Sequence, residues 1–124
     1  MTNLEQKSQL GRYLNKEERF LVPRKEFYDA PAFIIVSTPR DYKYAEKDTA
    51  CAIENMLLAS HAKGLGGVWV NQLNRHVDTP YVRKILDDFG VPSDHIVHGS
   101  MALGYPKKFT SKPRKNKGKV TYIK

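Results

Sequence analysis

The chain has 124 residues, 40% hydrophobic and 27% charged, which predicts one globular domain over residues 1–124 and leaves no room for a second. No apolar run is long enough to cross a bilayer, the first 20 residues lack a signal-peptide hydrophobic region, and a single cysteine excludes an internal disulfide framework. The formal net charge of +8 comes from residues 107–124, a basic C-terminal arm with eight Lys or Arg residues and no Asp or Glu. We therefore expect a cytoplasmic protein with no membrane partner.

The first expected elements are a helix and a strand. Residues 2–20 carry a weak apolar stripe at helical spacing, interrupted by Gly11, which predicts a helix. Residues 33–36 form the run FIIV, which is continuously apolar and rich in β-branched side chains. Such a run is typical of a strand buried on both faces, and the polar stretch after it predicts a loop.

The next segment predicts a helix from Asp48 to Lys63, with Asp48 as its N-cap and Gly64 at its stop position. At 100° per residue its polar residues are scattered around the whole circumference, so this helix has no broad polar face. A helix that is apolar on most sides is normally buried, and we expect Cys51 within it to be a buried apolar residue. A small domain hardly provides that much cover, which predicts a second subunit packed over this helix.

The remaining elements complete an alternating order. Residues 67–71, GVWVN, predict a short strand, and Thr79 with Pro80 predicts the start of a helix that runs through Phe89 and ends at Gly90. A final strand is expected at residues 95–103, and a short closing strand at residues 120–123. The order helix, strand, helix, strand, helix, strand indicates an α+β protein, an α/β/α sandwich with helices on the sheet faces.

The stretch KGLGGVWVNQL raises the question of what comes close to three glycines in four positions. It does not fit a dinucleotide fingerprint, because Trp69 stands where that motif needs its third glycine and because the glycines follow a helix. One interpretation makes Gly64 a helix C-cap and places Gly66 and Gly67 in a tight turn. The other has the backbone amides of residues 66–72 facing a flat ligand at close range.

The histidines and serines do not form a familiar catalytic or metal motif. His95 and His98, three residues apart, are expected on opposite faces of a strand and lack Cys or carboxylate companions at zinc spacing. No metal site is predicted. Ser100 does not stand in a G-x-S-x-G motif, so hydrolase chemistry is equally unsupported.

The basic arm leaves three interpretations open. It gathers Lys112, Arg114 and Lys115 around a proline, and such a cluster could clamp a phosphate, with Arg as a planar donor fork. A solvated end is the simplest alternative. Non-specific nucleic-acid binding is the third, but the sequence shows no recognition helix and no RNA-binding motif.

Three stretches together resemble the nitroreductase family of flavin mononucleotide (FMN) enzymes: DTACAIENMLLASHAKGLGGVWVNQL, HGSMALGYP and the trailing KPRK, in that order. The stretch APAFIIVST is similar to the family's central strand, so the resemblance covers roughly residues 27–124. It implies a nitroreductase-type fold in which two subunits interlock through long central helices, with a flavin in each of two clefts at the homodimer interface. That arrangement would explain the missing polar face of the helix at residues 48–63.

The resemblance also implies a cofactor site and an activity. The backbone after the glycines is expected to pass along the flavin ring, and basic residues of the arm are expected to approach the flavin phosphate. By position these residues are Gly66, Trp69, Val70, Asn71 and Gln72 for the ring, and Lys112 and Arg114 for the phosphate. No catalytic side chain is assigned. The implied activity is that of an oxidoreductase, in which NAD(P)H gives hydride to FMN and a nitroaromatic, quinone or similar small-molecule acceptor takes the electrons.

The chain departs from the family at its front. Members begin with a helix preceded by an Arg-x-Ser-x-Arg motif that holds the phosphate and the ribityl chain, and Arg12 in LGRYLNK does not match that motif. The resemblance therefore implies a fold truncated at the N-terminus. Three interpretations follow: a shortened product, a diverged member that binds flavin weakly, and a remnant that has lost catalysis and serves as a dimerisation or binding module. A basic protein associated with nucleic acid is the least favoured alternative.

Overall fold

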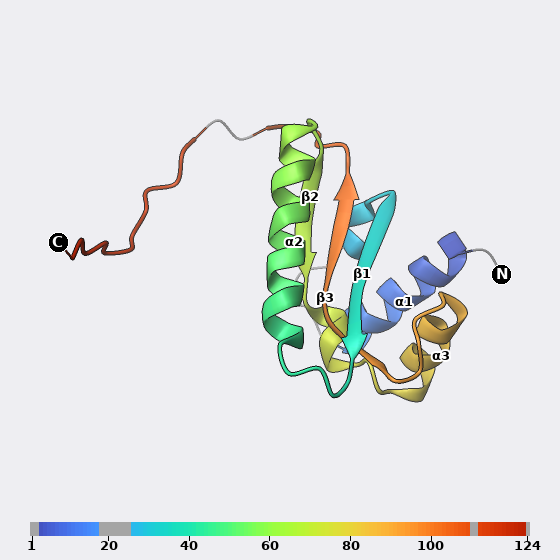
Figure 1. Ribbon diagram of the computed structural model, residues 1–124. Helices are drawn as coiled ribbons and strands as arrows, with labels where there is room; N and C mark the ends of the chain where they lie inside the picture. Colours follow the sequence, from blue (N-terminus) through green and yellow to red (C-terminus); the bar gives the residue numbers. More distant parts are fainter. Residues whose placement is uncertain (1–2, 18–25, 110–111, 124) are drawn as a thin grey trace.

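The computed structural model describes residues 3–17, 26–109 and 112–123 (Figure 1). In chain order the elements are α1 (Asn3–Glu17), η1 (Glu26–Asp29), β1 (Ala32–Pro39), α2 (Ala45–Ala62), β2 (Gly66–Val70), η2 (Gln72–Arg75), α3 (Pro80–Asp88) and β3 (His95–Gly104). Helices and strands alternate as the sequence predicts, with two short 3-10 helices, η1 and η2, in addition. The expected end of the first helix, at residues 18–20, lies outside the described residues.

The three strands form one antiparallel sheet in the order β1-β3-β2 (Figure 1). β3 lies in the middle, and its pairing with β2 extends from Gly66↔Gly104 to Val70↔Ser100. Among the described residues β2 is therefore an edge strand. Its outer edge presents backbone groups that do not pair with β3.

A β-bulge interrupts the pairing of β3 with β1. Val36 pairs with Gly99, and the next residue of β1, Ser37, pairs with Val97, so His98 has no partner in β1. An extra residue of this kind is left out of the ladder and bends the strand locally. The backbone of His98 consequently needs a hydrogen-bond partner outside the sheet.

Helices cover both faces of the sheet, which is the expected α/β/α sandwich. α2 packs against one face and contacts all three strands. The other face carries the main hydrophobic core, to which α1, α3, η1, η2 and all three strands contribute side chains. Its fully buried members are Leu10, Leu14, Leu73, Val82 and Leu86.

The packing of α2 requires two glycines in the sheet. A Cβ on Gly99 would collide with Ile53 Cδ1 and would lie 3.1 Å from Thr49 Cγ2, both on α2. A Cβ on Gly67 would collide with Met101 Cε of β3, and would lie 3.0 Å from Leu57 Cδ2 and 3.2 Å from Ser60 Oγ, both on α2. What comes close to Gly67 is therefore the protein itself, because a side chain there would separate the helix from the sheet.

The tight turn that one interpretation placed at Gly66 and Gly67 is absent, whereas the short strand predicted from residue 67 is present. Gly64 ends α2 with a φ of +72°, in the left-handed region that favours glycine, and this confirms its expected stop role. Gly66 and Gly67, however, belong to β2. The reversal is already complete before them, because the Leu65 N–H donates a hydrogen bond to the Ser60 carbonyl oxygen at 2.8 Å.

α2 begins three residues earlier than the sequence predicts. Tyr44, rather than Asp48, occupies the N-cap position, and it makes no side-chain capping hydrogen bond. Asp48 lies within the first turn, where its charge favours the positive end of the helix dipole. Its carboxylate accepts a hydrogen bond from the Tyr42 hydroxyl, which raises the pKa of that phenol.

α3 begins where the sequence predicts and ends one residue earlier. Thr79 is its N-cap residue and Pro80 its first residue, although the Thr79 hydroxyl donates to the His76 carbonyl oxygen at 2.8 Å instead of capping the helix. α3 ends at Asp88, and Gly90 follows with a φ of +86°. The rigid φ of proline suits a first helical turn, which explains why this start could be recognised from the sequence.

An exposed ion pair ties the loop after β1 to the loop before α3. Arg40 donates two hydrogen bonds to the carboxylate of Asp78, one of them at 3.2 Å. These hydrogen bonds, with a smaller charge effect, hold the pKa of Asp78 below its ordinary value. A carboxyl with a lowered pKa stabilises the fold above its ordinary pKa, and that stabilisation is lost as the pH falls through the lowered value. Solvent screening keeps the contribution small.

In the single chain α2 buries only a narrow stripe of side chains. Its buried residues are Ala45, Thr49, Ile53 and Ser60. On the outward side Leu58 is 60% exposed, and Cys51 is exposed as well, so the expectation of a buried cysteine is wrong for the single chain. No described helix is both long and apolar enough to span a membrane. α2 thus presents apolar surface that one chain leaves uncovered.

The basic arm runs away from the domain as an extended chain (Figure 1). Residues 112–123 form no helix or strand, so the strand expected at residues 120–123 is absent. A strand needs a neighbouring strand for its hydrogen bonds, and nothing in the described part of this chain pairs with the arm. Near its tip the arm carries two large apolar side chains that are exposed: Tyr122 at 85% and Ile123 at 96%.

Candidate functional site

Four of the residues predicted to bind the flavin ring lie together at the exit of β2. Trp69 and Val70 end the strand, Asn71 is the N-cap residue of η2, and Gln72 begins η2. The Trp69 side chain lies on the α2 side of the sheet, where its Nε1 is 3.4 Å from the Cβ position of Gly99, whereas Val70 belongs to the core on the opposite face. With these two side chains directed above and below the sheet, the outer edge of β2 consists of backbone.

The peptide between Val70 and Asn71 has a fixed orientation. Ser100 of β3 donates a hydrogen bond from its hydroxyl to the Val70 carbonyl oxygen at 2.9 Å, so this carbonyl points toward β3. The described peptide bonds are all trans. In a trans peptide the N–H points opposite to the carbonyl, so the Asn71 N–H points away from β3 and toward the free edge. The exit of β2 therefore presents a backbone hydrogen-bond donor outward.

Asn74 of η2 connects this exit to the bulge in β3. Its side-chain nitrogen donates to the His98 carbonyl oxygen at 2.5 Å and, over a longer distance of 3.4 Å, to Asn71 Oδ1. Its backbone N–H donates to the Asn71 carbonyl oxygen at 3.2 Å. The bulged residue thereby obtains the hydrogen-bond partner that the ladder does not supply.

Asn74 was not among the predicted site residues, and no role was predicted for Ser100. Ser100 is fully buried, and the only signal that could have indicated its role is a lone hydroxyl within the apolar run of β3. Asn74 follows no motif in the sequence. Its role depends on a bulge whose position is set by the pairing of two strands distant in the chain.

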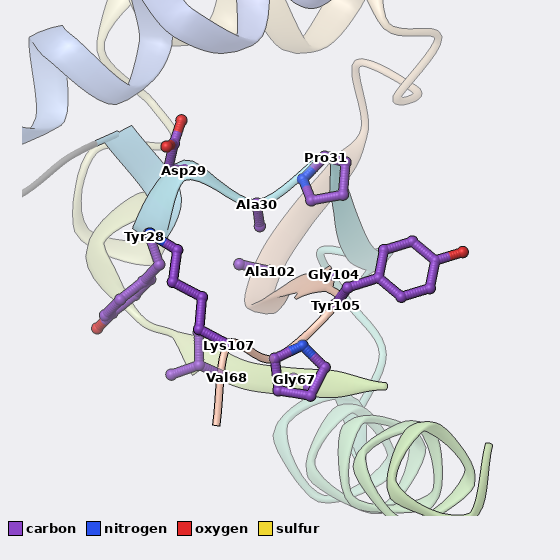
Figure 2. A pocket seen from close by; sticks show the side chains of 12 residues that line it. Tyr28, Asp29, Ala30, Pro31, Gly67, Val68, Ala102, Gly104, Tyr105 and Lys107 are labelled. Carbon is purple, nitrogen blue, oxygen red and sulfur yellow. The ribbon is translucent and has the colours of Figure 1, made fainter. Parts of the chain in front are cut away.

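A pocket of about 480 Å³ lies at the other end of β2 (Figure 2). Its floor is formed by small residues of β2 and β3, and Tyr28, Pro106 and Lys107 stand around it. Gly66 lines this pocket, and a Cβ on it would lie 3.4 Å from the Pro106 Cβ. At roughly 3.3 Å per strand residue, Gly66 is about 16 Å from Asn71, so the structure does not bring it together with the other four ring-binding residues.

The predicted phosphate-binding residues, Lys112 and Arg114, lie apart from the exit of β2. Both are exposed on the arm, which leaves the domain near the C-terminal end of α2 and runs away from the sheet (Figure 1). At the start of the arm the Phe109 ring lies edge-on to the His61 ring of α2, with centroids 6.4 Å apart. Within one chain, therefore, the basic pair and the ring-binding backbone do not form a single site.

Comparison with known sequences decides the family. The nitroreductase family model matches residues 2–105. The chain belongs to the nitroreductase family. The resemblance was expected to start near residue 27. The match begins at residue 2 and therefore also includes α1. It ends before Lys112 and Arg114, so their proposed role does not follow from the match itself.

Solved structures confirm the nitroreductase-type fold. The chain is similar to a nitroreductase with bound FMN from Bacteroides fragilis NCTC 9343, with a TM-score of 0.81 and 33% identity over 98% of this chain and 70% of that chain. An FMN-dependent nitroreductase from Clostridium difficile R20291 gives a TM-score of 0.72 over 96% of this chain and 72% of that one. Its identity is 18%, so this second likeness concerns the fold alone.

Two archaeal relatives match a shorter part of this nitroreductase-family chain. Proteins named as candidate NADH dehydrogenases or NAD(P)H nitroreductases are 32% identical to it, over 80 residues in Archaeoglobus fulgidus and 82 residues in Methanothermobacter thermautotrophicus. These regions cover 61% and 63% of this chain. They cover 44% and 41% of the relatives, so the match spans less than half the length of either protein.

Proposed function

We propose that this chain is an FMN-dependent oxidoreductase of the nitroreductase type that works as a homodimer. It takes hydride from NAD(P)H and passes electrons to a nitroaromatic, a quinone or a similar small acceptor. The observation that carries the proposal is the backbone edge at the exit of β2, in a chain 33% identical to a nitroreductase with bound FMN. NAD(P)H as the hydride donor is supported by the names of the two archaeal relatives.

The exit of β2 fits the polar edge of a flavin ring. The ring carries acceptor atoms at N5 and O4, and the Asn71 N–H points outward from the sheet at this place. Backbone donors of this kind cost no side-chain ordering and hold a ring in one orientation. FMN, when bound, supplies the hydride chemistry, whereas residues 69–72 would hold the ring edge and keep water away from it.

The phosphate end of the site requires a second copy of the chain. Lys112 and Arg114 are the predicted phosphate ligands, yet the arm carries them away from the β2 exit of the same chain. A site that contains both parts therefore consists of β2 from one protomer and the arm from its partner. An extended arm is suited to reach a partner's phosphate site. Within the described part of its own chain it pairs with no strand that would hold it back.

The outward side of α2 supports the same dimer. Leu58 is 60% exposed, and Cys51, two turns earlier on the same side, is exposed as well. Exposed apolar side chains on the outward side of a helix suit a contact with a second subunit. Packing α2 against a second α2 would remove this surface from water and would bring the arm of each protomer to the other domain.

The purified protein is expected to be yellow, with flavin absorption bands, one FMN per chain and a mass in solution twice the chain mass of 14.2 kDa. Anaerobic addition of NADH or NADPH should bleach these bands, and a nitroaromatic or quinone should restore them. A colourless monomer that takes up no added FMN would contradict the proposal. Salt-sensitive retention on DNA by such a protein would instead favour the nucleic-acid alternative.

Arg114→Ala is expected to weaken FMN binding about 10- to 100-fold, the usual effect of losing a hydrogen bond to a charged group, and to reduce its salt dependence. The dissociation constant is measured by quenching of flavin fluorescence at several salt concentrations. Lys119→Ala is the matched control, because it removes the same charge from the same arm. Riboflavin, which lacks the phosphate, should bind the wild type and Arg114→Ala equally. Unchanged FMN affinity in Arg114→Ala would remove this residue from the site.

A further inference from the structure

We propose that Ser100 and Asn74 are positioning residues for the flavin-binding edge of β2. The inference rests on the proposed function, because it concerns how the same site is oriented. Ser100 is fully buried and acts only through the backbone of Val70. Asn74 acts through Asn71 and through the bulge in β3.

Ser100 sets the direction in which Asn71 presents its N–H. The Ser100 hydroxyl holds the Val70 carbonyl oxygen at 2.9 Å, at the last residue pair of the β2–β3 ladder. Beyond this pair the chain leaves the sheet and turns into η2, so no further ladder hydrogen bond restrains it. Since the peptide is planar, holding the carbonyl also holds the N–H on the opposite side. Without the hydroxyl this peptide would lose one of the contacts that hold its orientation at the end of the strand.

Asn74 fixes the same exit from the side of η2. It binds the side chain and the carbonyl of Asn71 and also the carbonyl of His98, the residue that the bulge leaves out of the ladder. The carbonyl oxygen of the bulged residue His98 thus accepts a hydrogen bond from Asn74, which links η2 to β3. Ser100 holds the carbonyl that precedes the Asn71 N–H, and Asn74 holds the Asn71 side chain and the carbonyl that follows it. Preorganised donors are effective because they need not reorganise when the ligand binds.

A purely structural role would have a different signature, and Ser60 provides the comparison. Ser60 on α2 is also buried, at 6% exposure, and its hydroxyl donates to a backbone carbonyl, that of Leu57, at 2.8 Å. Ser60→Ala and Ser100→Ala therefore both remove a hydroxyl-to-carbonyl hydrogen bond from a buried serine. They differ in that only Ser100 is bound to the exit of β2.

The test measures FMN affinity and the flavin spectrum in wild type, Ser100→Ala, Asn74→Asp and Ser60→Ala, together with thermal unfolding of each protein without FMN. Asn74→Asp keeps the size of the side chain and removes both donors. We expect FMN to bind about fivefold more weakly in Ser100→Ala and about tenfold more weakly in Asn74→Asp, with a shifted flavin absorption band in both. Ser60→Ala should bind FMN within about twofold of wild type, although its unfolding temperature falls as far as that of Ser100→Ala.

Hydrogen exchange in the absence of FMN gives an independent result. The Asn74 amide, whose N–H donates to the Asn71 carbonyl oxygen at 3.2 Å, should lose protection in Ser100→Ala relative to wild type, and should be unchanged in Ser60→Ala. If Asn74→Asp does not fold, Ser100→Ala, which removes a single oxygen atom, carries the test. Equal FMN affinities and spectra in Ser100→Ala and Ser60→Ala would overturn the positioning role alone. A wild type that binds no FMN would overturn the proposed function, and the positioning role with it.

Discussion

Gly99→Val is expected to lower the free energy of unfolding by about 3 kcal/mol, because it inserts a branched side chain where β3 touches α2. The Cβ alone would collide with Ile53 Cδ1 and would lie 3.1 Å from Thr49 Cγ2. Both of these side chains are buried, with exposures of 0% and 1%, so an added side chain requires Ile53 to repack or α2 to shift. For a chain of this size the melting temperature should fall by about 10 °C.

Gly118→Val on the arm is the matched control for this substitution. A Cβ at Gly118 would lie near only the Asn116 side chain, and the residue is exposed, so its melting temperature should stay within about 2 °C of wild type. The comparison is made by thermal unfolding of the FMN-free proteins. An unchanged melting temperature in Gly99→Val would show that α2 does not pack as closely on the sheet as the structure describes.

The position of Gly99 illustrates what the sequence could not provide. Local signals predicted the elements well: the apolar run of β1, the Thr79–Pro80 start of α3 and the stop at Gly64 all depend on neighbouring residues. Gly67 and Gly99 depend instead on a helix that packs across the sheet. From the sequence, one interpretation placed Gly67 in a tight turn, and Gly99 was simply part of the strand expected at residues 95–103. Contacts between segments distant in the chain determine why both positions require glycine.

The same distinction applies to the candidate site. The resemblance to the nitroreductase family indicated residues 69–72, and the structure places them together because they are adjacent in the chain. It could not indicate Ser100 or Asn74, which reach this segment across the β2–β3 ladder and from η2. Nor could it show that the basic arm runs away from its own domain. The role of Arg114 therefore stays a prediction, and it depends on a second copy of the chain.

Leu58→Asp is expected to convert the proposed dimer into a monomer and to release FMN at the same time. Leu58 is the most exposed large apolar residue of α2, at 60%, and a carboxylate buried at an α2–α2 contact without a partner would be strongly unfavourable. The dimer dissociation constant should rise by at least about 100-fold. Because the proposed site combines β2 of one protomer with the arm of its partner, the monomer lacks the phosphate ligands and should lose bound flavin.

Sedimentation velocity and the flavin-to-protein ratio, measured on the same sample, test this coupling. Ser93→Asp adds the same charge at an exposed position in the turn between α3 and β3, and should leave both the mass and the flavin content unchanged. The unfolding of the monomer should also change little, since Leu58 makes few contacts within its own chain. A Leu58→Asp dimer with full FMN would place the subunit contact elsewhere. A Leu58→Asp monomer with full FMN would show that one chain holds the phosphate unaided, and that the arm contributes nothing to its partner.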